Sequence, residues 1–443
     1  MKYTHVEDIG SGGFGIVDQV ISETGEIFAR KTFSLQNQPH RLPPELVTNV
    51  KARFRREAIF QSDIKHKNIV PVLDHDLKTD PPFFIMPQAI CSLEADLKVD
   101  KTIGGNYLTV IMDIIAGLEA IHRLRVFHRD LKPGNVLKYP EPEDSTKFYY
   151  SITDFGLMSQ REAGVTTLTN TDMQKGSDFY TAPEIANGLK KASPQSDIYS
   201  LGCILHDMVS GSASRVPFQE INERGPFGSI IHKCTKLDPN KRFKSVNSLR
   251  DAIISEGDIL IKSAGAKELA KILEDPNPLS KESWESLLTY IEENKNEDDC
   301  LELLRKLSSD QITSLCIDFP LLAPQLGTLF SEWTGNSSFP FSNTDGLASR
   351  LEIFISHCQI ETKVECLMAM LYLGTSHNRF YVEDKFTSHT KPNMDADYAK
   401  RLALEFRVEE DRVCHAIHHL EKSINFNRNN FHPELVSALK QIC

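Results

Sequence analysis

The sequence predicts an α+β domain followed by an all-α region, and three observations carry this prediction. Residues 10–31 hold closely spaced glycines between β-rich runs. Residues 128–137, HRDLKPGNVL, gather charged and polar side chains in one short loop between two apolar runs. From residue 281 onward, apolar residues recur at helical spacing. A chain of 443 residues has the length of two or three domains.

Near the start, three glycines form a G-x-G-x-x-G pattern that a valine follows: Gly10, Gly12, Gly15 and Val17. This pattern also opens dinucleotide-binding folds, but those need a helix directly after the glycines. Here residues 15–21 are β-rich, residues 22–25 form a turn and residues 27–31 make another strand. The glycines therefore predict a β-hairpin whose backbone N–H groups approach phosphates closely. Lys31, on the next strand, can hold the α- and β-phosphates.

The loop at 128–137 holds the groups that a phosphoryl transfer needs. Asp130 can accept a proton from an incoming hydroxyl, and Lys132 can neutralise charge on the transferring group. Asn135 can bind a metal ion. Positioning and electrostatic stabilisation are nearly all that this reaction asks of a protein. The loop therefore predicts phosphoryl transfer, and the partner motifs on both sides make a plain charged surface loop the weaker interpretation.

With its partner motifs, the chain resembles the eukaryotic-type (Hanks-type) protein kinases over roughly residues 1–258. The family motifs occur in order and at the family's spacing. Besides the glycines and the loop at 128–137, the matching residues are Ala29-Arg30-Lys31 for the V-A-I-K strand, Glu57 for the αC glutamate, Asp154-Phe155-Gly156 for D-F-G, Ala182-Pro183-Glu184 for A-P-E, Asp197 for the αF aspartate, and Arg242 for the arginine that pairs with the A-P-E glutamate.

The resemblance implies a bilobal protein-kinase fold that binds ATP between an N-lobe (1–89) and a C-lobe (90–258). It implies that Asp130 accepts the hydroxyl proton, that Lys31 pairs with Glu57, and that Lys132 marks serine/threonine kinases. Mg²⁺ would be held by Asn135 and Asp154. The hinge would be Pro87-Gln88-Ala89 after the gatekeeper Met86. The residues implied to contact ATP are Gly10, Gly12, Gly15, Val17, Ala29, Lys31, Met86, Gln88, Ala89, Asn135 and Asp154.

Regulation is expected between the D-F-G and A-P-E motifs. A phosphorylated residue there would pair with Arg129 and order the segment. Phe155 would pack beneath the helix that carries Glu57, so its position would report whether the kinase is on or off. The Ser177 hydroxyl would reach Asp130 and Lys132. The candidates for autophosphorylation are Thr166, Thr167, Thr169 and Thr171. The alternative is an unmodified threonine-rich turn.

One position departs from the family pattern. Gln61, four residues after Glu57, stands where the family places an apolar residue. A buried amide without partners costs about 1–3 kcal/mol, so either Gln61 finds a partner or the helix sits differently when inactive. Two other function classes stay open: a kinase-fold scaffold that binds without catalysis, and a small-molecule phosphotransferase of related fold.

Composition limits the partners. The net charge of −11 and the pI near 5.8 disfavour nucleic-acid and anionic-membrane binding, and the expected acceptor is a protein Ser/Thr hydroxyl. No apolar run is long enough to span a membrane, and no signal peptide is expected. Nine cysteines without C-x-x-C pairs favour reduced thiols in a cytoplasmic protein, with no structural disulfide.

After a predicted linker at 259–280, residues 281–443 are expected to form an all-helical regulatory or partner-binding domain of unknown ligand. This region resembles no named family. A group at helical spacing, Cys414, His415, His418 and His419, could bind a metal, but a polar helix face is the favoured interpretation. Phe330, Trp333 and Phe339 are expected in the core rather than in a partner groove.

Overall fold

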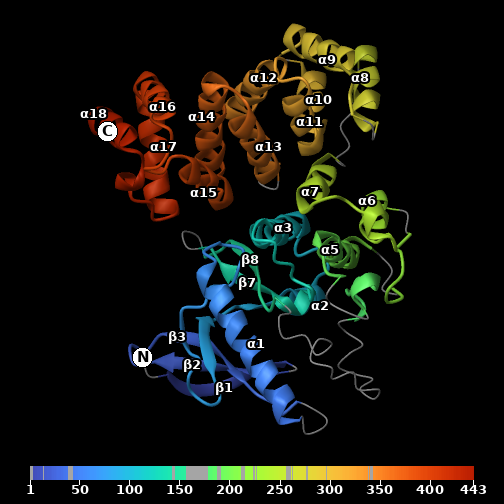
Figure 1. The fold of residues 1–443 in the computed structure, drawn as a ribbon, viewed down its shortest axis with the longest axis vertical. Helices are drawn as coiled ribbons and strands as arrows, with labels where there is room; N and C mark the ends of the chain where they lie inside the picture. The colour runs from blue at the N-terminus through green and yellow to red at the C-terminus, as the bar shows by residue number, and fades with distance from the viewer. Residues whose placement is uncertain are drawn as a thin grey trace. The chain divides into compact units, whose positions relative to one another are not determined.

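The structure is a computed structural model, and it describes residues 3–12, 14–37, 43–141, 145–155, 178–186, 191–210, 215–222, 225, 227–255, 261, 263–275, 278–295, 297–337, 339 and 343–443. The chain forms two compact units, Met1–Leu249 and Arg250–Cys443. The first unit has an α+β fold, and in the second unit every described element is a helix (Figure 1). The predicted fold class is therefore confirmed.

The first unit begins with a five-stranded antiparallel sheet in the order β1-β2-β3-β5-β4. Its strands are β1 (Tyr3–Gly12), β2 (Gly15–Ser22), β3 (Ile27–Phe33), β4 (Asp74–Asp76) and β5 (Phe83–Pro87). Helix α1 (Pro44–Asp63) packs on this sheet, where its Val50, Phe54 and Ala58 join an apolar cluster with Phe33 and Phe84. Pro44 at the start of α1 suits the first turn of a helix, where no N–H is needed.

The glycines join two antiparallel strands, as the sequence predicts. Strands β1 and β2 pair with Gly12 opposite Gly15, and β2 pairs with β3 so that Val17 lies opposite Lys31. Strand β3 alternates partly exposed with buried residues from Phe28 to Phe33, which places the side chain of Lys31 on the inner side.

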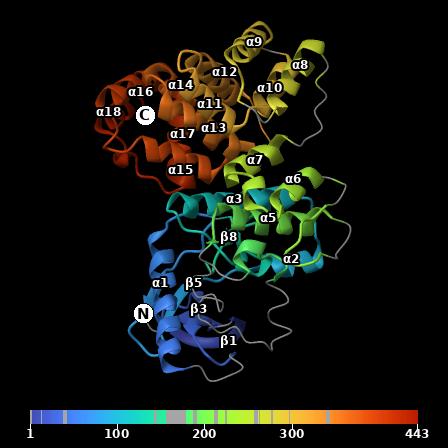
Figure 2. The ribbon, with the colours of Figure 1, turned by 45° about the vertical axis from the view of Figure 1, so that its right-hand side comes forward.

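The rest of the first unit is mainly helical around a small sheet (Figure 2). That sheet pairs β6 (Cys91–Ser92), β7 (Val136–Pro140) and β8 (Phe148–Ile152) in this order. The described helices of this part of the first unit are α2 (Leu93–Val99), α3 (Tyr107–Arg123), η1 (Pro133–Asn135), η2 (Pro183–Ile185), α5 (Pro194–Val209), α6 (Gly228–Cys234), η4 (Pro239–Lys241) and the start of α7 (Val246–Ser255). Both α3 and α5 are buried over most of their length, so they form the core that supports the loop at 128–137.

The second unit is a helical array in which α12 and α13 pack on α14, and α18 packs on α16 (Figure 1). Its helices are α8 (Ala264–Glu274), α9 (Lys281–Glu293), α10 (Asp298–Lys306), α11 (Ser309–Asp318), α12 (Ala323–Asn336), α13 (Thr344–His357), α14 (Ile360–His377), α15 (Phe380–His389), α16 (Ala396–Val408), α17 (Glu410–Ser423), η6 (Arg428–Asn430) and α18 (Pro433–Ile442). None of the helices in the described ranges is both long and apolar enough to cross a membrane.

Of the three aromatic residues expected in the core of the second unit, Phe330 and Trp333 are buried and Phe339 is half-buried. Trp333 is buried and makes edge-on contacts with Phe330 and Phe339, at ring-centroid distances of 5.4 and 5.1 Å. The same interior holds ion pairs: Arg350 pairs with Asp251 at 2.9 Å, and Arg379 pairs with Asp345 at 2.7 Å. All four of these charged side chains are buried, so each pair depends on both of its members.

The predicted linker differs from what the structure contains. Helix α8 occupies much of 259–280, because Ser263 caps it and its residues Ala266, Leu269 and Leu273 form a buried stripe. The boundary between the two compact units falls earlier, inside α7, after Leu249. Helix α8 ends at Glu274, just before the prolines from which the sequence predicted a linker or a helix stop.

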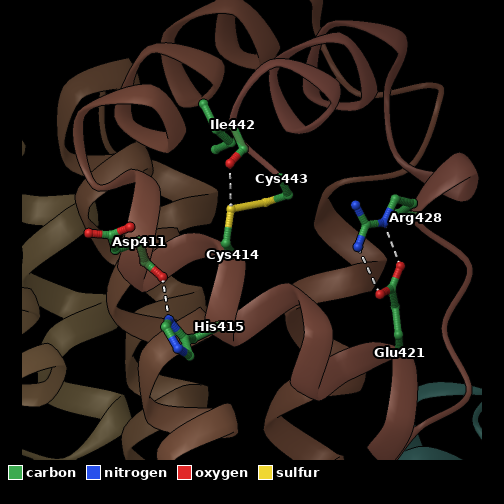
Figure 3. Close-up of a disulfide and its surroundings, with 7 residues drawn as sticks. All are labelled: Asp411, Cys414, His415, Glu421, Arg428, Ile442 and Cys443. Atoms are coloured by element: carbon green, nitrogen blue, oxygen red, sulfur yellow. Dashed lines mark hydrogen bonds and ion pairs between the residues drawn. A yellow bond between two sulfur atoms is a disulfide. The ribbon is translucent and has the colours of Figure 1, made fainter.

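The expectation that the cysteines stay unpaired is wrong for one pair. Cys414 on α17 forms a disulfide with Cys443, which follows α18, across a sequence separation of 29 residues (Figure 3). Spacing could not show this, because the turn between the two helices brings the residues together. In the described ranges the remaining cysteines are free. His415 and His418 lie on the exposed face of α17, where the favoured interpretation placed them.

Candidate active site

Lys31 is the centre of the candidate site. Its Nζ donates to Glu57 Oε1 at 2.9 Å, and it also forms an ion pair with Asp154. Strand β3 supplies the lysine, α1 supplies the glutamate, and the segment after β8 supplies the aspartate. The structure thus brings together three residues that the sequence predicted for one site, with α1 in the position that allows the pair.

Burial and charge set the protonation of this group. Burial lowers the pKa of Lys31, but the charges of Asp154 and Glu57 outweigh burial and raise it above its ordinary value. Burial raises the pKa of Glu57 more than the charge of Lys31 lowers it. Burial also raises the pKa of Asp154, but there Lys31 prevails and the pKa is lowered. Asp154 therefore stays a carboxylate, and its side chain is 42% exposed and can accept a cation.

The loop at 128–137 closes on itself through its functional side chains. Lys132 Nζ donates to Asp130 Oδ2 at 2.8 Å, and Asn135 Nδ2 donates to the backbone oxygen of Asp130 at 2.8 Å. Burial lowers the pKa of Lys132, but the charge of Asp130 prevails and raises it, so the lysine stays charged. The backbone N–H of Thr153 donates to the backbone carbonyl oxygen of Asn135, which ties this loop to the segment that carries Asp154.

Asp197 holds this loop from below. Its carboxylate accepts the backbone N–H groups of His128 and Arg129 at 2.9 and 3.0 Å, and its Oδ2 lies 2.7 Å from His122 Nε2. Arg129 has a φ of 67°, a conformation that a non-glycine residue keeps only when its surroundings hold it. Asp197 was matched from the motif, but His122 was missed, since a histidine at the end of a helix carries no sequence signal.

Two further contacts support the site. Arg242 donates to both carboxylate oxygens of Glu184, at 2.8 and 2.9 Å, which is the pair that the sequence motifs predict. Phe155 is fully buried and makes edge-on contacts with Phe60 of α1 and His128, at centroid distances of 5.8 and 5.5 Å. The aromatic ring beside Asp154 thus links α1 to the loop at 128–137.

The predicted hinge borders an apolar wall. Met86 on β5 pairs with Ala29 on β3, and both belong to the buried cluster of the sheet. Val17, Ala89 and Leu137 pack on that cluster and remain partly exposed, so they offer apolar surface to a flat ring. Leu137 was missed by sequence reasoning, although an apolar residue two positions after Asn135 was a usable signal.

The polar groups of the hinge differ in their partners. Tyr139 donates its hydroxyl hydrogen to the Pro87 carbonyl at 3.4 Å, and Pro87 has no N–H to offer. The side-chain oxygen of Gln88 is buried and has no partner within the described part of the chain. That the backbone of Ala89 bonds to the nucleotide therefore stays a prediction from the sequence.

The glycine segment leaves room beside Lys31. A Cβ added at Gly15 would lie 3.5 Å from Cε of Lys31 and 3.4 Å from the Thr32 carbonyl. A side chain at residue 15 would therefore fill the space next to the ammonium group, where phosphates would bind. Gly10 and Gly12 lie on β1, across from β2.

The donor set also fits a divalent cation of the hard, oxygen-binding kind. The Asp154 carboxylate and the amide oxygen of Asn135 are oxygen ligands, and the Asn135 amide nitrogen is already engaged by Asp130. In the described ranges, no group of three or more His, Cys, Asp or Glu side chains gathers as a separate metal site. A cation bound here would have phosphate oxygens among its ligands, beside the two protein groups.

Five predicted regulatory positions lie outside the described residues, Thr166, Thr167, Thr169, Thr171 and Ser177, and so does Gly156 of the D-F-G motif. Gln61 does find a partner, because its Nε2 donates to the Val70 carbonyl at 2.6 Å. Of the two outcomes expected for this buried amide, the first is therefore the one found.

Comparisons with known proteins match the chain over its first two thirds in one family model and over about half of its length in the individual relatives. A family model described as "Protein kinase domain" matches residues 3–308, and no family model matches the chain beyond them. The "Probable serine/threonine-protein kinase pknA2" of Bifidobacterium longum is 32% identical over 251 residues, which cover 54% of this chain and 31% of that protein. "Cell division control protein 2 homolog 3" of Trypanosoma brucei brucei is 29% identical over 258 residues, or 56% of this chain and 75% of that protein.

A third relative, "Serine/threonine-protein kinases drp72" of Corynebacterium efficiens, is 32% identical over 237 residues, which cover 48% of this chain and 44% of that protein. The chain thus spans less than half of the length of the Bifidobacterium and Corynebacterium relatives.

Proposed function

Because the chain belongs to the protein kinase family, we propose that it is a serine/threonine protein kinase that transfers the γ-phosphate of ATP to protein hydroxyl groups. Proteins of this family use ATP and a divalent cation. The names of the Bifidobacterium and Corynebacterium relatives support the choice of serine and threonine as acceptors. The observation that carries the proposal is the joining of Lys31, Glu57 and Asp154 beside the Asp130–Lys132 pair.

In this proposal each polar group has one task. Asp130 orients the acceptor hydroxyl and takes its proton, while Lys132 balances negative charge on the transferring group. Lys31, held by Glu57, binds the α- and β-phosphates. Asp154 and Asn135 would hold the divalent cation, Mg²⁺ in this proposal, which would supply positive charge to the phosphates. The partly exposed Val17, Ala89 and Leu137 enclose the base.

Control of the activity is part of the proposal. Autophosphorylation among Thr166, Thr167, Thr169 and Thr171 would supply a phosphate for Arg129, and it would switch the kinase on. The second unit would regulate the kinase or recruit a partner. Mass spectrometry before and after incubation with ATP tests the first point, and an unmodified segment in an active enzyme would contradict it.

Transfer from γ-labelled ATP to a generic protein acceptor, with Mg²⁺, tests the main proposal. We expect labelling by the wild type and a loss of at least about 100-fold in Asp130→Asn, because the proton acceptor is removed. Asp63→Asn, an exposed carboxylate at the end of α1, is the matched control and should label normally. Binding of ATP without labelling in any sample would favour a scaffold, and transfer to small-molecule hydroxyls alone would favour a small-molecule phosphotransferase.

A further inference from the structure

Gln61 is a polar residue in a fully buried position of α1. It lies one helical turn after Glu57, so both side chains share one face of the helix. Their exposed fractions are 0% for Gln61 and 1% for Glu57. A buried amide on the face that carries the Lys31 partner needs a physical reason, because an apolar side chain would be desolvated at less cost.

The amide makes one well-defined hydrogen bond. Gln61 Nε2 donates to the Val70 carbonyl oxygen at 2.6 Å, and Val70 is itself fully buried. The orientation of the amide follows from the chemistry, because only its nitrogen can donate to a carbonyl. This bond fixes the second half of α1 to the chain at Val70.

Val70 is in turn fixed to the segment that ends in Asp154. Its N–H donates to the Ile152 carbonyl at 3.0 Å, and the Ile152 N–H donates to the Asn68 carbonyl at 2.9 Å. Asp154 follows two residues later and pairs with Lys31, which also binds Glu57. The contacts therefore form a closed ring that leaves α1 at Gln61 and returns to it at Glu57.

We propose that Gln61 is a positioning residue for the phosphoryl transfer: its bond to Val70 holds α1 at the height at which Glu57 meets Lys31. The inference rests on the proposed kinase function and adds to it a residue that touches neither nucleotide nor acceptor. An apolar contact at this position would let α1 slide, whereas a hydrogen bond fixes both distance and direction.

The other half of the amide argues against simple space filling. Gln61 Oε1 is buried and has no partner within the described part of the chain. An apolar residue of the same size would avoid this unsatisfied acceptor, although it would leave the Val70 carbonyl without its donor. The two effects oppose each other in stability, but only the loss of the tether acts on Glu57.

The first variant is Gln61→Met in the full chain, which keeps the length of the side chain and removes the amide. We expect kcat to fall about five- to tenfold, the value of one lost hydrogen bond, with little change in Tm. Ile59→Met, at a half-exposed site of the same helix, is the matched control and should leave kcat unchanged. A fall in kcat that only follows a fall in Tm would overturn the proposal.

A double-mutant cycle with Glu57→Gln supplies the readout that a merely structural role would not move. If Gln61 acts through Glu57, Gln61→Met should lower kcat in the wild-type background and change it less than about twofold in the Glu57→Gln background. The affinity for a fluorescent ATP analogue with Mg²⁺ is measured on the wild type, the two single variants and the double variant. It shows independently of turnover whether the effect of Gln61→Met depends on Glu57. Equal losses in both backgrounds would overturn the proposal.

The two proposals fail in different ways. A wild type that binds the ATP analogue but transfers no phosphate contradicts the kinase function. An active wild type with equal losses in both backgrounds contradicts only the role of Gln61.

Discussion

Lys31 serves two carboxylates, and this sharing defines the site at the level of single residues. Glu57 is buried and Asp154 is partly exposed, so the two acids are not equivalent partners. The pKa of Asp154 is lowered and that of Glu57 is raised. The carboxylate that keeps its negative charge more readily is therefore Asp154, the one that a cation can reach. A divalent ion would compete with Lys31 for Asp154 and leave the lysine to Glu57 and to phosphate.

Asp197→Asn should lower the activity and, at neutral pH, the free energy of unfolding. Burial raises the pKa of Asp197, but hydrogen bonds and charges from His122 and His128 prevail and lower it. A lowered pKa stabilises the fold above the pKa of the unfolded chain, and this contribution is lost as pH falls through the folded value. We expect a deficit of about 3 kcal/mol at pH 7 that shrinks below roughly pH 4.

Urea unfolding of wild type and Asp197→Asn, at a series of pH values from neutral to acidic, measures this deficit. Asp63→Asn provides the comparison for an exposed aspartate. A deficit that stays constant through the acidic range would contradict the role of the Asp197 charge.

At this scale the sequence motifs predicted the chemical groups and two of their supports, Asp197 and the Arg242–Glu184 pair, but not the contacts of Gln61 and His122. Lys31, Asp130 and Asp154 each belong to a short motif that can be recognised in the sequence by itself, although the three motifs come together only in the fold. The partner of Gln61 was not predictable, since Val70 lies in an irregular segment whose path depends on the folded sheet. His122 was not predictable either, because a histidine near the end of a helix does not show which carboxylate it will meet.

Among the helices, α12 shows how closely the second unit is packed. A Cβ at Gly327 would overlap Thr362 Cγ2 of α14 and lie 3.2 Å from a ring carbon of Phe354 on α13. We expect Gly327→Ala to lower the free energy of unfolding by about 1–3 kcal/mol, because the helices must move apart. Thermal unfolding followed by circular dichroism measures the change.

Gly335, on the same helix, is the matched control. A Cβ there would meet Ala369 at 3.4–3.5 Å, an ordinary contact distance. Gly335→Ala should be neutral or stabilising by up to about 1 kcal/mol, since alanine favours helix more than glycine does. Equal destabilisation by both substitutions would mean that the close approach of Gly327 to Thr362 is not the cause.

The disulfide between α17 and the end of α18 should stabilise these two helices. In the chain-entropy account, closing a loop of 29 residues is worth about 3–4 kcal/mol. We expect dithiothreitol to lower the urea midpoint of the wild type and to leave Cys443→Ser unchanged. A wild type that is insensitive to reductant would show that the apolar contacts of Leu435 and Leu439 suffice to hold α18.

Helix patterns in the second unit were predictable from the spacing of apolar residues, and the core positions of Trp333 and Phe330 follow from the same spacing. Its interior charges were not, because a sequence does not show which arginine will find which carboxylate. The disulfide was missed for a related reason: sequence separation says nothing about the turn that returns α18 to α17.

For the chain as a whole, the boundary inside α7 is the feature with the largest consequence. Asp251 belongs to the second unit, where its carboxylate accepts from Arg350 and from the backbone N–H of Ser309. Asp251→Asn should lower the stability of the second unit by about 3–5 kcal/mol, because it leaves a buried guanidinium without its anion. Denaturant unfolding of the full chain tests this expectation.

The same variant tests whether the second unit controls the kinase. If it does, phosphate transfer by Asp251→Asn should change more than about twofold near its unfolding midpoint, in one direction or the other. Lys281→Gln, which removes a charge from an exposed ion pair in this unit, should change neither stability nor transfer. Unchanged transfer by the destabilised variant would contradict control by this unit.

The hydroxyl of Tyr139 on the Pro87 carbonyl bears on the design of inhibitors. A carbonyl oxygen has two lone pairs, and here one of them already has a donor. A purine-like compound can therefore donate one hydrogen bond to the free lone pair of the Pro87 carbonyl. Because proline has no N–H, the compound must accept its next hydrogen bond from the backbone of Ala89. Compounds built to place two donors on the first hinge carbonyl should therefore spare this enzyme, and a phenylalanine at position 139 should restore their potency.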